Sequence, residues 1–348
     1  MCIRDSSHTA SMAGNYQGAI ALLNKLGIST VDGLESLLNT LMILHVHQPI
    51  SGNKIASLSC SGGEASLIAD LAEQFNFRFP KLSSKQKRKL KSVLGDLVHL
   101  SNPLDYQTYV WNDQVKLTVA FKTMMEETYD FLFIIMDLPK QGRCSSDSWH
   151  PAIAALKEAK KIAKCPVGLI TSLEENMPEK FAKDLIKHSI IPLTGLENSL
   201  AAVKALQNVS IQWKIKSTPS IIWERWPNEK SRVLDEYQSK KVLSKIGINV
   251  PKGFVITDKN SLLNKFRTIK KAVALKAIGI NHKTDVSGVV LGINNENELL
   301  NKFNNMKRLT RSKEFLIERH VDNCLVELLV GIVRDPQHGF MITIAEGG

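Results

Sequence analysis

Short apolar runs alternate with amphipathic helical segments from residue 54 to residue 206, and this alternation constrains the fold more than any other feature. Strands are predicted over 54–59, 130–136, 166–170 and 190–192, and helices over 65–75, 115–129, 152–163, 178–187 and 196–206. Strands that alternate with helices pair in parallel and carry helices on both faces of the sheet. The sequence therefore predicts an α/β domain with a doubly wound parallel sheet. Its ligands would bind beyond the carboxyl ends of the strands.

The turn after the first predicted strand contains Ser61, Gly62 and Gly63, just before the predicted helix 65–75. A strand, a glycine turn and a helix in this order present backbone amides to an anion at the helix start. Glycines also occur in tight turns for steric reasons alone, so the pattern leaves both interpretations open.

Polar residues follow the neighbouring strands as well. An Asn-Pro-Leu-Asp segment contains Asn102 and Asp105, and Asp137 follows the predicted strand 130–136. We expect Asn102 and Asp105 to lie near Gly62, at the carboxyl ends of the strands. Asp105 and Asp137 suit acid–base chemistry, but carboxylates that form turns are the more frequent case.

A histidine near the start of the chain, His8, stands between Ser7 and Thr9 and precedes an apolar helical stretch over 19–23. A neutral imidazole is a nucleophile at pH 7 and can accept a phosphoryl group. The N-terminus of the following helix would favour phosphate through its free N–H groups. From the tripeptide alone, a helix cap beside a histidine is the commoner case.

A second pair of histidines, His45 and His47, has a spacing that suits a metal ion. Without a third ligand nearby, such a pair is more typical of surface or interfacial histidines.

The last third of the chain predicts an amphipathic helix over 234–243, with Glu236 and Lys240 four residues apart on one face. Further strands are predicted over 253–256 and 272–277, with a helix over 260–268 between them. Lys276 lies in the otherwise apolar second strand, where an ammonium is costly unless an anion meets it. It contacts either a ligand, which we favour, or an acidic side chain. The polar stretch 279–291 is either a loop that closes over phosphates or an ordinary surface loop.

The composition is that of a globular protein, with 43% hydrophobic and 23% charged residues and enough length for two ordinary domains. The net charge is +11, and its densest source is the run from Lys85 to Lys91. This run contains no aromatic residue, so we expect a solvated helix face and no nucleic-acid partner. No apolar run is long enough to span a membrane. The five cysteines form no CxxC pair, which indicates a reducing, cytoplasmic location.

Several of these segments together resemble the NDP-forming acyl-CoA synthetases, the ADP-forming acetate–CoA ligase group related to succinyl-CoA synthetase. In the first part of the chain these are Ser7-His8-Thr9 with Ala13-Gly14, the Ser61-Gly62-Gly63 turn, and Asn102 to Asp105. The last third resembles the first half of the ATP-grasp domain of the same enzymes. There the segments are Glu236 to Lys240, the Lys276 strand, His282-Lys283-Thr284-Asp285, Phe315 to Glu318, Val326 to Gly331 and Arg334 to Gln337. The resemblance implies a flavodoxin-like domain followed by a partial ATP-grasp domain.

The resemblance also implies roles for individual residues. His8 would carry the phosphoryl group between acyl phosphate and nucleotide, and His282 would receive it and pass it to ADP. The helix start at Ser61, Gly62 and Gly63 would help to receive the phosphorylated histidine. The implied nucleotide-binding residues are Glu236, Lys240, Lys276 (at the phosphates), Lys283, Glu318 (near the adenine hinge) and Glu327 (on the nucleotide side of the sheet).

The implied activity is that of an acid–thiol ligase, which interconverts acid, CoA and ATP with acyl-CoA, ADP and phosphate in the presence of Mg²⁺. Its partners would be a small carboxylic acid, CoA and nucleotide, with no membrane partner, and the complete protein would be a homo-oligomer. One alternative is a non-catalytic, ligand-sensing region of a protein acetyltransferase. Another is an ATP-grasp ligase that works without phosphohistidine. The presence of both His8 and His282 favours the catalytic phosphohistidine route.

The expected organisation is a remnant with the phosphohistidine segment over 1–48, a flavodoxin-like domain over 49–208, a linker over 209–230 and a truncated ATP-grasp domain over 231–348. Residues 1–5 match nothing in the family and look like a spurious leader. The family's CoA-binding domain and its acidic magnesium ligands have no counterpart in the sequence. We therefore expect these 348 residues alone to be inactive.

Overall fold

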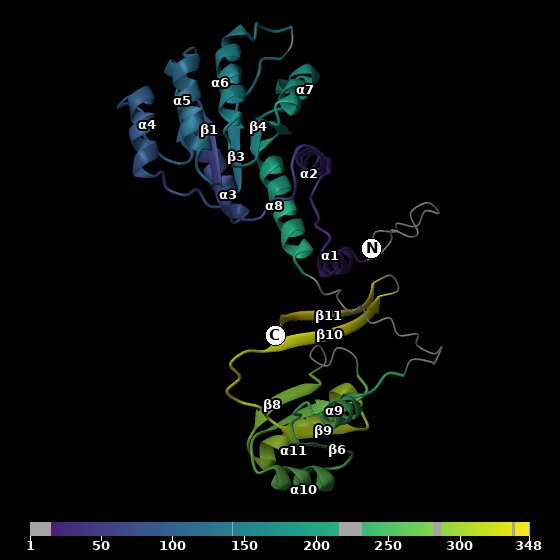
Figure 1. Cartoon of the computed structure of the whole chain (residues 1–348). Helices are drawn as coiled ribbons and strands as arrows, with labels where there is room; N and C mark the ends of the chain where they lie inside the picture. Colours follow the sequence, from purple (N-terminus) through teal and green to yellow (C-terminus); the bar gives the residue numbers. More distant parts are fainter. Residues whose placement is uncertain (1–14, 141, 216–231, 281–286, 336–337, 348) are drawn as a thin grey trace, which may run out of the picture. The chain divides into compact units, whose positions relative to one another are not determined.

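The structure is a computed structural model that describes residues 15–140, 142–215, 232–280, 287–335 and 338–347. His8, His282 and Lys283 lie outside the described residues. Contacts divide the chain into two compact units near Ile221 (Figure 1). Each unit is considered separately below.

The first unit is built on a five-stranded parallel sheet with the order β2-β1-β3-β4-β5. The strands are β1 (Ile55–Ser59), β2 (Leu104–Asp105), β3 (Phe131–Ile135), β4 (Val167–Thr171) and β5 (Ile191–Thr194). This is the flavodoxin-like order. Successive strands are added on one side of β1 and then on the other, so the topological switch point lies between β1 and β3. The predicted doubly wound sheet is confirmed.

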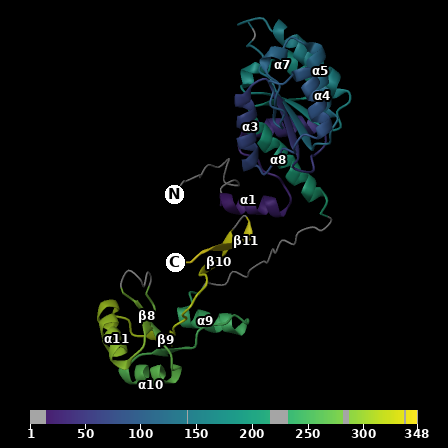
Figure 2. The ribbon, with the colours of Figure 1, turned by 90° about the vertical axis from the view of Figure 1, so that its left-hand side faces the viewer.

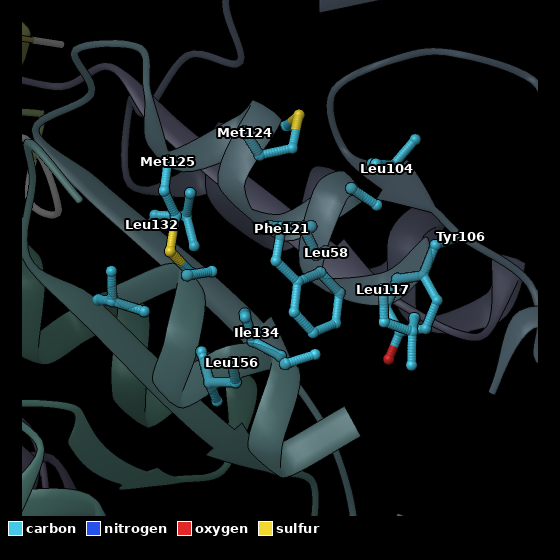
Figure 3. Packing of buried hydrophobic residues seen from close by; sticks show 14 of the residues in the cluster. Leu58, Leu104, Tyr106, Leu117, Phe121, Met124, Met125, Leu132, Ile134 and Leu156 are labelled. Carbon is cyan, nitrogen blue, oxygen red and sulfur yellow. The ribbon is translucent and has the colours of Figure 1, made fainter. Parts of the chain in front are cut away.

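Helices cover both faces of this sheet (Figure 2). The face formed with α4 (Ser84–Leu94), α5 (Gln114–Met125) and α6 (His150–Lys160) buries Leu132 and Ile134 of β3 (Figure 3). The opposite face, with α2 (Leu34–Val46), α3 (Gly62–Gln74) and α8 (Leu196–Trp213), buries Phe131, Phe133 and Ile135. Every residue of β3 is buried, as expected for a central strand of a parallel sheet. The remaining helices of this unit are α1 (Tyr16–Lys25), α7 (Glu179–Lys187) and the short 3₁₀ turns η2 (Thr108–Val110), η3 (Asp147–Trp149) and η4 (Glu174–Asn176).

The basic run is helical, as the sequence predicts. Ser83 and Gln86 form a capping box at the start of α4, and the side chains of Leu90 and Leu94 are buried. Lys89 and Lys91 reach outward to Glu126 and Asp96, at 2.7 Å each. The lysines thus lie on a solvated face.

The predicted linker over 209–230 starts too early, because α8 continues to Trp213. Its last turn packs against the end of α1, where the chain passes very close to it. A Cβ at Gly27 would lie only 2.9 Å from Cβ of Gln212, and Gly27 has a φ of +74°. The local sequence pattern cannot reveal this tertiary contact.

The second unit contains a four-stranded sheet with the order β6-β9-β7-β8, in which the recorded pairs are antiparallel. Its strands are β6 (Gly253–Ile256), β7 (Val273–Ala277), β8 (Val289–Ile293) and β9 (Phe315–Arg319). The helices are α9 (Glu236–Lys245), α10 (Lys259–Ile269) and α11 (Glu296–Thr310). One face of the sheet packs on α10 and α11 around Phe303, Phe315 and Ile317. The predicted loop 279–291 is shorter at its end than expected, because β8 begins at Val289.

Two further strands, β10 (Leu328–Asp335) and β11 (Gly339–Glu346), form a separate two-stranded sheet. Their aliphatic side chains are largely exposed, for example Ile332 at 68% and Ile344 at 68%. Within the described ranges, no helix has both the length and the apolar character needed to cross a membrane.

Candidate functional site

Lys276 and Glu318 lie on neighbouring antiparallel strands of the second unit. In the register of β7 and β9, Lys276 is opposite Leu316 and Glu318 is opposite Ala274, so the two charged residues are diagonal neighbours on one face. The alternate residues Leu275 and Ile317 point into the core on the other face. The strand pairing therefore places an ammonium and a carboxylate side by side on the face that the core leaves open.

Helix α9 adds a second pair to this face. Glu236 and Lys240 are one helical turn apart, and Lys240 Nζ lies 2.9 Å from Glu236 Oε1. Lys276 Nζ lies 2.6 Å from Glu236 Oε1 and 2.8 Å from Glu318 Oε1, while Lys240 Nζ lies 2.5 Å from Glu318 Oε2. The four side chains form one closed network of alternating charge, which we call the Lys276–Glu318 cluster. The sequence-predicted Glu236, Lys240, Lys276 and Glu318 are thus brought together.

The cluster is largely withdrawn from solvent. The side chain of Glu318 is 4% exposed, and those of Lys240 and Lys276 are 19% and 20% exposed. Burial lowers the pKa of Lys276, but its hydrogen bonds with Glu236 and Glu318 outweigh this effect, so the pKa lies above its ordinary value. Lys276 therefore carries a fixed positive charge. The two explanations that the sequence left open for Lys276 are a ligand and an ion pair, and the structure contains the ion pair.

Glu327 is not part of this network. It is exposed, and it lies directly before β10, where its carbonyl accepts a hydrogen bond from the N–H of Gly347 at 2.8 Å. No ion pair joins it to Lys240 or Lys276 in the part of the chain that the structure describes. Its proposed place beside a nucleotide remains a prediction.

In the first unit, the Ser61-Gly62-Gly63 segment forms the start of α3. Ser61 is the N-cap, and the first intrahelical bond runs from the N–H of Ala65 to the carbonyl of Ser61 at 3.1 Å. The N–H groups of Gly62, Gly63 and Glu64 therefore precede the hydrogen-bond ladder, as an anion-binding helix start requires. The helix begins earlier than the predicted residue 65, so both glycines belong to its first turn.

Three carboxylates gather around this helix start. Asp105 accepts hydrogen bonds from the backbone N–H and the side chain of Gln107, at 2.9 and 2.6 Å. Asp137 accepts from the N–H of Ser172 at 2.7 Å and from Asn176 at 3.0 Å. Both therefore perform the turn-forming role that the sequence allowed. Glu64 is the third, and within the described residues its buried Oε2 atom has no hydrogen-bond partner.

The ionisation of Glu64 is strongly affected by this environment. Burial, reinforced by the charges of Asp137 and Asp105, raises its pKa to about 7. Burial and the charge of Glu64 also raise the pKa of the Cys60 thiol to about 11, so that Cys60 is a neutral thiol. Sequence inspection did not select Glu64. The sequence places Glu64 in the first turn of the helix, but its burial beside Asp137 and Asp105 depends on the tertiary fold.

Replacing Glu64 with glutamine should change how stability depends on pH. A carboxyl whose pKa rises from 4.5 in the unfolded chain to about 7 in the fold favours the folded state below pH 4.5, and this contribution is lost as the pH rises through 7. Because Glu64 is only partly buried, we expect Glu64→Gln to be more stable than the wild type by about 1 kcal/mol at pH 8 but not at pH 4. Urea unfolding at both pH values measures this difference. Asp70→Asn, an exposed change on the same helix, is the control, and an equal pH response of all three proteins would contradict the prediction.

Asn102 does not lie at the carboxyl ends of the strands, contrary to the sequence-based expectation. β2 pairs with β1 through Leu104 and Leu58, so the residues before Leu104 lie beside the beginning of β1. There the Asn102 amide donates to the carbonyls of Ile55 and Pro80, at 3.1 and 3.2 Å. Asn102 is therefore a structural residue.

His45 and His47 are both exposed, and the His47 ring contacts the carbonyl of Gln48. Within the described ranges, no group of three His, Cys, Asp or Glu side chains is placed to hold a metal ion. Their position agrees with the surface interpretation.

Comparison with known proteins identifies similarities in both sequence and structure. The family described as "ATP-grasp domain" matches residues 225–348, the part that contains the Lys276–Glu318 cluster. The acetate–CoA ligase [ADP-forming] of Methanocaldococcus jannaschii is 24% identical over 98% of this chain. The chain is thus similar, over nearly its whole length, to an ADP-forming acetate–CoA ligase. A trans-feruloyl-CoA synthase of an unknown prokaryotic organism is likewise 24% identical over 99% of the chain.

This chain spans about half the length of the curated synthetases that it matches, 51% of the first and 50% of the second. Among solved structures, it is similar to the dinucleotide-forming acetyl-coenzyme A synthetase 1 of Ca. Korarchaeum cryptofilum in complex with phosphate and ADP. That likeness has a TM-score of 0.47 at 19% identity and covers 59% of this chain and 43% of the synthetase chain.

Proposed function

We propose that this chain carries the nucleotide-binding and phosphohistidine steps of an ADP-forming acyl-CoA synthetase. In the overall reaction, acyl-CoA, phosphate and ADP are converted to the acid, CoA and ATP, or the reverse. Phosphate first displaces CoA from the acyl group and gives an acyl phosphate. A histidine then takes the phosphoryl group and releases the acid, and ADP finally takes the phosphoryl group from the histidine. Similarity to the ADP-forming acetate–CoA ligase supports this reaction class, and the Lys276–Glu318 cluster is the observation that assigns nucleotide binding to particular residues.

In this cluster, Lys276 is a cation that could bind a phosphate group in place of its carboxylate partners. Two carboxylates hold Lys276 at 2.6 and 2.8 Å, a geometry in which carboxylate oxygens occupy positions that phosphate oxygens could occupy. In the proposed complex, Lys276 binds the nucleotide phosphates. Lys240 then remains paired with Glu236 and Glu318, so no carboxylate is left buried without a partner. Glu318 lies near the adenine hinge, as the resemblance implies.

The proposed phosphoryl route joins His8 to His282. His8 takes the phosphoryl group from acyl phosphate, and His282, with Lys283 beside it in sequence, passes it to ADP. The free N–H groups at Gly62 and Gly63 would stabilise the phosphorylated histidine in transit. Ionised Glu64 opposes an anion there, so we expect this docking to favour the protonated form of Glu64.

Magnesium would neutralise phosphate charge when it is bound with the nucleotide. The described residues offer no three-ligand group for it, so none of the steps above depends on a metal ligand from this part of the chain.

The test of the nucleotide site is a calorimetric titration with ADP in the presence of Mg²⁺, on the protein at the length at which its own cell makes it. Loss of a charged hydrogen bond costs about 1.5–3 kcal/mol, so Lys276→Gln should weaken ADP binding by at least about tenfold. Lys271→Gln removes an exposed lysine that is close in sequence and should leave the affinity unchanged. Circular dichroism confirms that both variants fold. Unchanged affinity in folded Lys276→Gln would contradict the proposal.

A further inference from the structure

A hollow of about 1030 Å³ opens in the first unit. One wall is formed by residues between β3 and α6, among them Leu138, Pro139 and Cys144, and the other by α6 and by α7 along its whole length. Leu138 and Pro139 follow β3, and Pro178 lies between β4 and α7, so this end of the hollow lies on the carboxyl side of the sheet, where α/β domains bind ligands. Its volume is at the upper end of the range for small-molecule pockets.

The hollow is lined by more cations than its acidic residues can neutralise. Lys157 pairs with Asp184 and Lys183 pairs with Glu179, at 2.5 Å each. These are the acidic side chains of the lining. In the described part of the chain, Lys180 and Lys187 form no ion pair.

The lysines of α7 are arranged along one line of the helix. Lys180, Lys183 and Lys187 follow the i, i+3, i+7 spacing of a single helix face, and all three line the hollow. Like charges three and four residues apart destabilise a helix. An anion held between them would relieve this repulsion. On α4, Lys89 and Lys91 pair with acidic side chains, and no lysine of that helix lines this hollow.

The same hollow has an apolar wall. Leu138, Pro139 and Ile153 line it from one side, and Phe181 lines it from α7. Leu138 and Ile153 also belong to the buried core, so this wall is fixed by the packing of the sheet. A ligand that fits both walls carries a negative charge at one end and a flat or apolar group at the other.

We propose that this hollow binds a phosphorylated organic molecule of about mononucleotide size, with its phosphates at Lys180 and Lys187 and its apolar part against Leu138, Ile153 and Phe181. The site is separate from the Lys276–Glu318 cluster and does not depend on the proposed function. Lysine side chains bind phosphate as point charges, which suits a helix face that offers several of them.

Cys144 provides a local probe, because it lines the hollow and its side chain is exposed. Alkylation by iodoacetamide, followed by peptide mass spectrometry, reports the rate at Cys144 with and without ADP at constant ionic strength. Cys324 is exposed and lies in the other unit, so its rate in the same sample is the internal reference. We expect ADP to slow alkylation of Cys144 at least threefold and to leave Cys324 unchanged.

Variants and probes separate this site from other causes. Lys180→Ala with Lys187→Ala should abolish the protection, whereas Lys85→Ala with Lys87→Ala removes the same charge from α4 and should retain it. Protection should also persist in Lys276→Gln, which disables the proposed ATP-grasp site only. Inorganic pyrophosphate should need at least a tenfold higher concentration than ADP. Equal protection by pyrophosphate, loss of protection in Lys276→Gln, or no protection by millimolar ADP would each overturn the proposal.

Discussion

Replacing Glu318 with alanine should lower the free energy of unfolding of the second unit by about 3 kcal/mol. The carboxylate is 4% exposed and contacts both Lys240 and Lys276. Its removal leaves two largely buried ammonium groups with Glu236 as their remaining partner in the cluster. Removing one partner of a buried pair costs far more than the pair itself contributes, because the other charge stays buried without compensation. Hydrogen exchange of peptides from β7 and β9 measures the loss in this unit directly.

Two comparisons make this result specific to the cluster. Glu314→Ala removes an exposed carboxylate just before the same strand, and we expect it to change stability by less than about 0.5 kcal/mol. Lys276→Met combined with Glu318→Met replaces an ion pair by apolar groups and leaves the Glu236–Lys240 pair intact, so it should cost less than Glu318→Ala alone. If Glu318→Ala and Glu314→Ala exchange at the same rate, the cluster contributes nothing to the fold.

The architecture of the first unit followed from its sequence because local pattern and tertiary packing agree there. The run from Phe131 to Met136 is apolar at every position, and a strand that is buried on both faces needs such a run. The alternation of strands and helices then restricted the sheet to a parallel one. The predicted helix end was wrong where tertiary packing is not visible in the local sequence pattern. The last turn of α8, which ends at Trp213, contacts Gly27, a residue far away in the sequence.

The candidate sites were predictable to different degrees for the same reason. Glu236 and Lys240 are four residues apart on a helix, and Lys276 is the ammonium in an apolar strand, so each could be selected locally. Their convergence with Glu318 depends on the register of β7 and β9, which the sequence pattern does not specify. Asn102 was misplaced because its position depends on the register of β2 against β1. Glu64 was missed because its raised pKa comes from burial in the fold, reinforced by Asp137 and Asp105 from distant parts of the sequence.

The phosphoryl route predicts opposite labelling patterns for two histidine variants. With acetyl phosphate labelled with ³²P as the donor, His8→Ala should lose the protein label by about a hundredfold or more, whereas His282→Ala should keep it on His8. With γ-labelled ATP and Mg²⁺, His282→Ala should lose the label, whereas His8→Ala should keep it on His282. The reason is that each P–O bond can break only if the next imidazole in the route is present to form the P–N bond. The experiment uses the protein at the length at which its own cell makes it, and peptide mass spectrometry locates the acid-labile label.

Histidines outside the route serve as matched controls for this crossed pattern. His45→Ala and His47→Ala change exposed residues of the same unit as His8 and should keep the label from both donors. The crossed result distinguishes a two-histidine relay from direct transfer between His8 and the nucleotide, because direct transfer would leave His282→Ala labelled by ATP. Full labelling of His8→Ala from acetyl phosphate would refute the role of His8. An ATP-grasp ligase that acts without phosphohistidine would give no acid-labile label in any of these proteins. The same labelling experiment therefore also distinguishes the two enzyme classes.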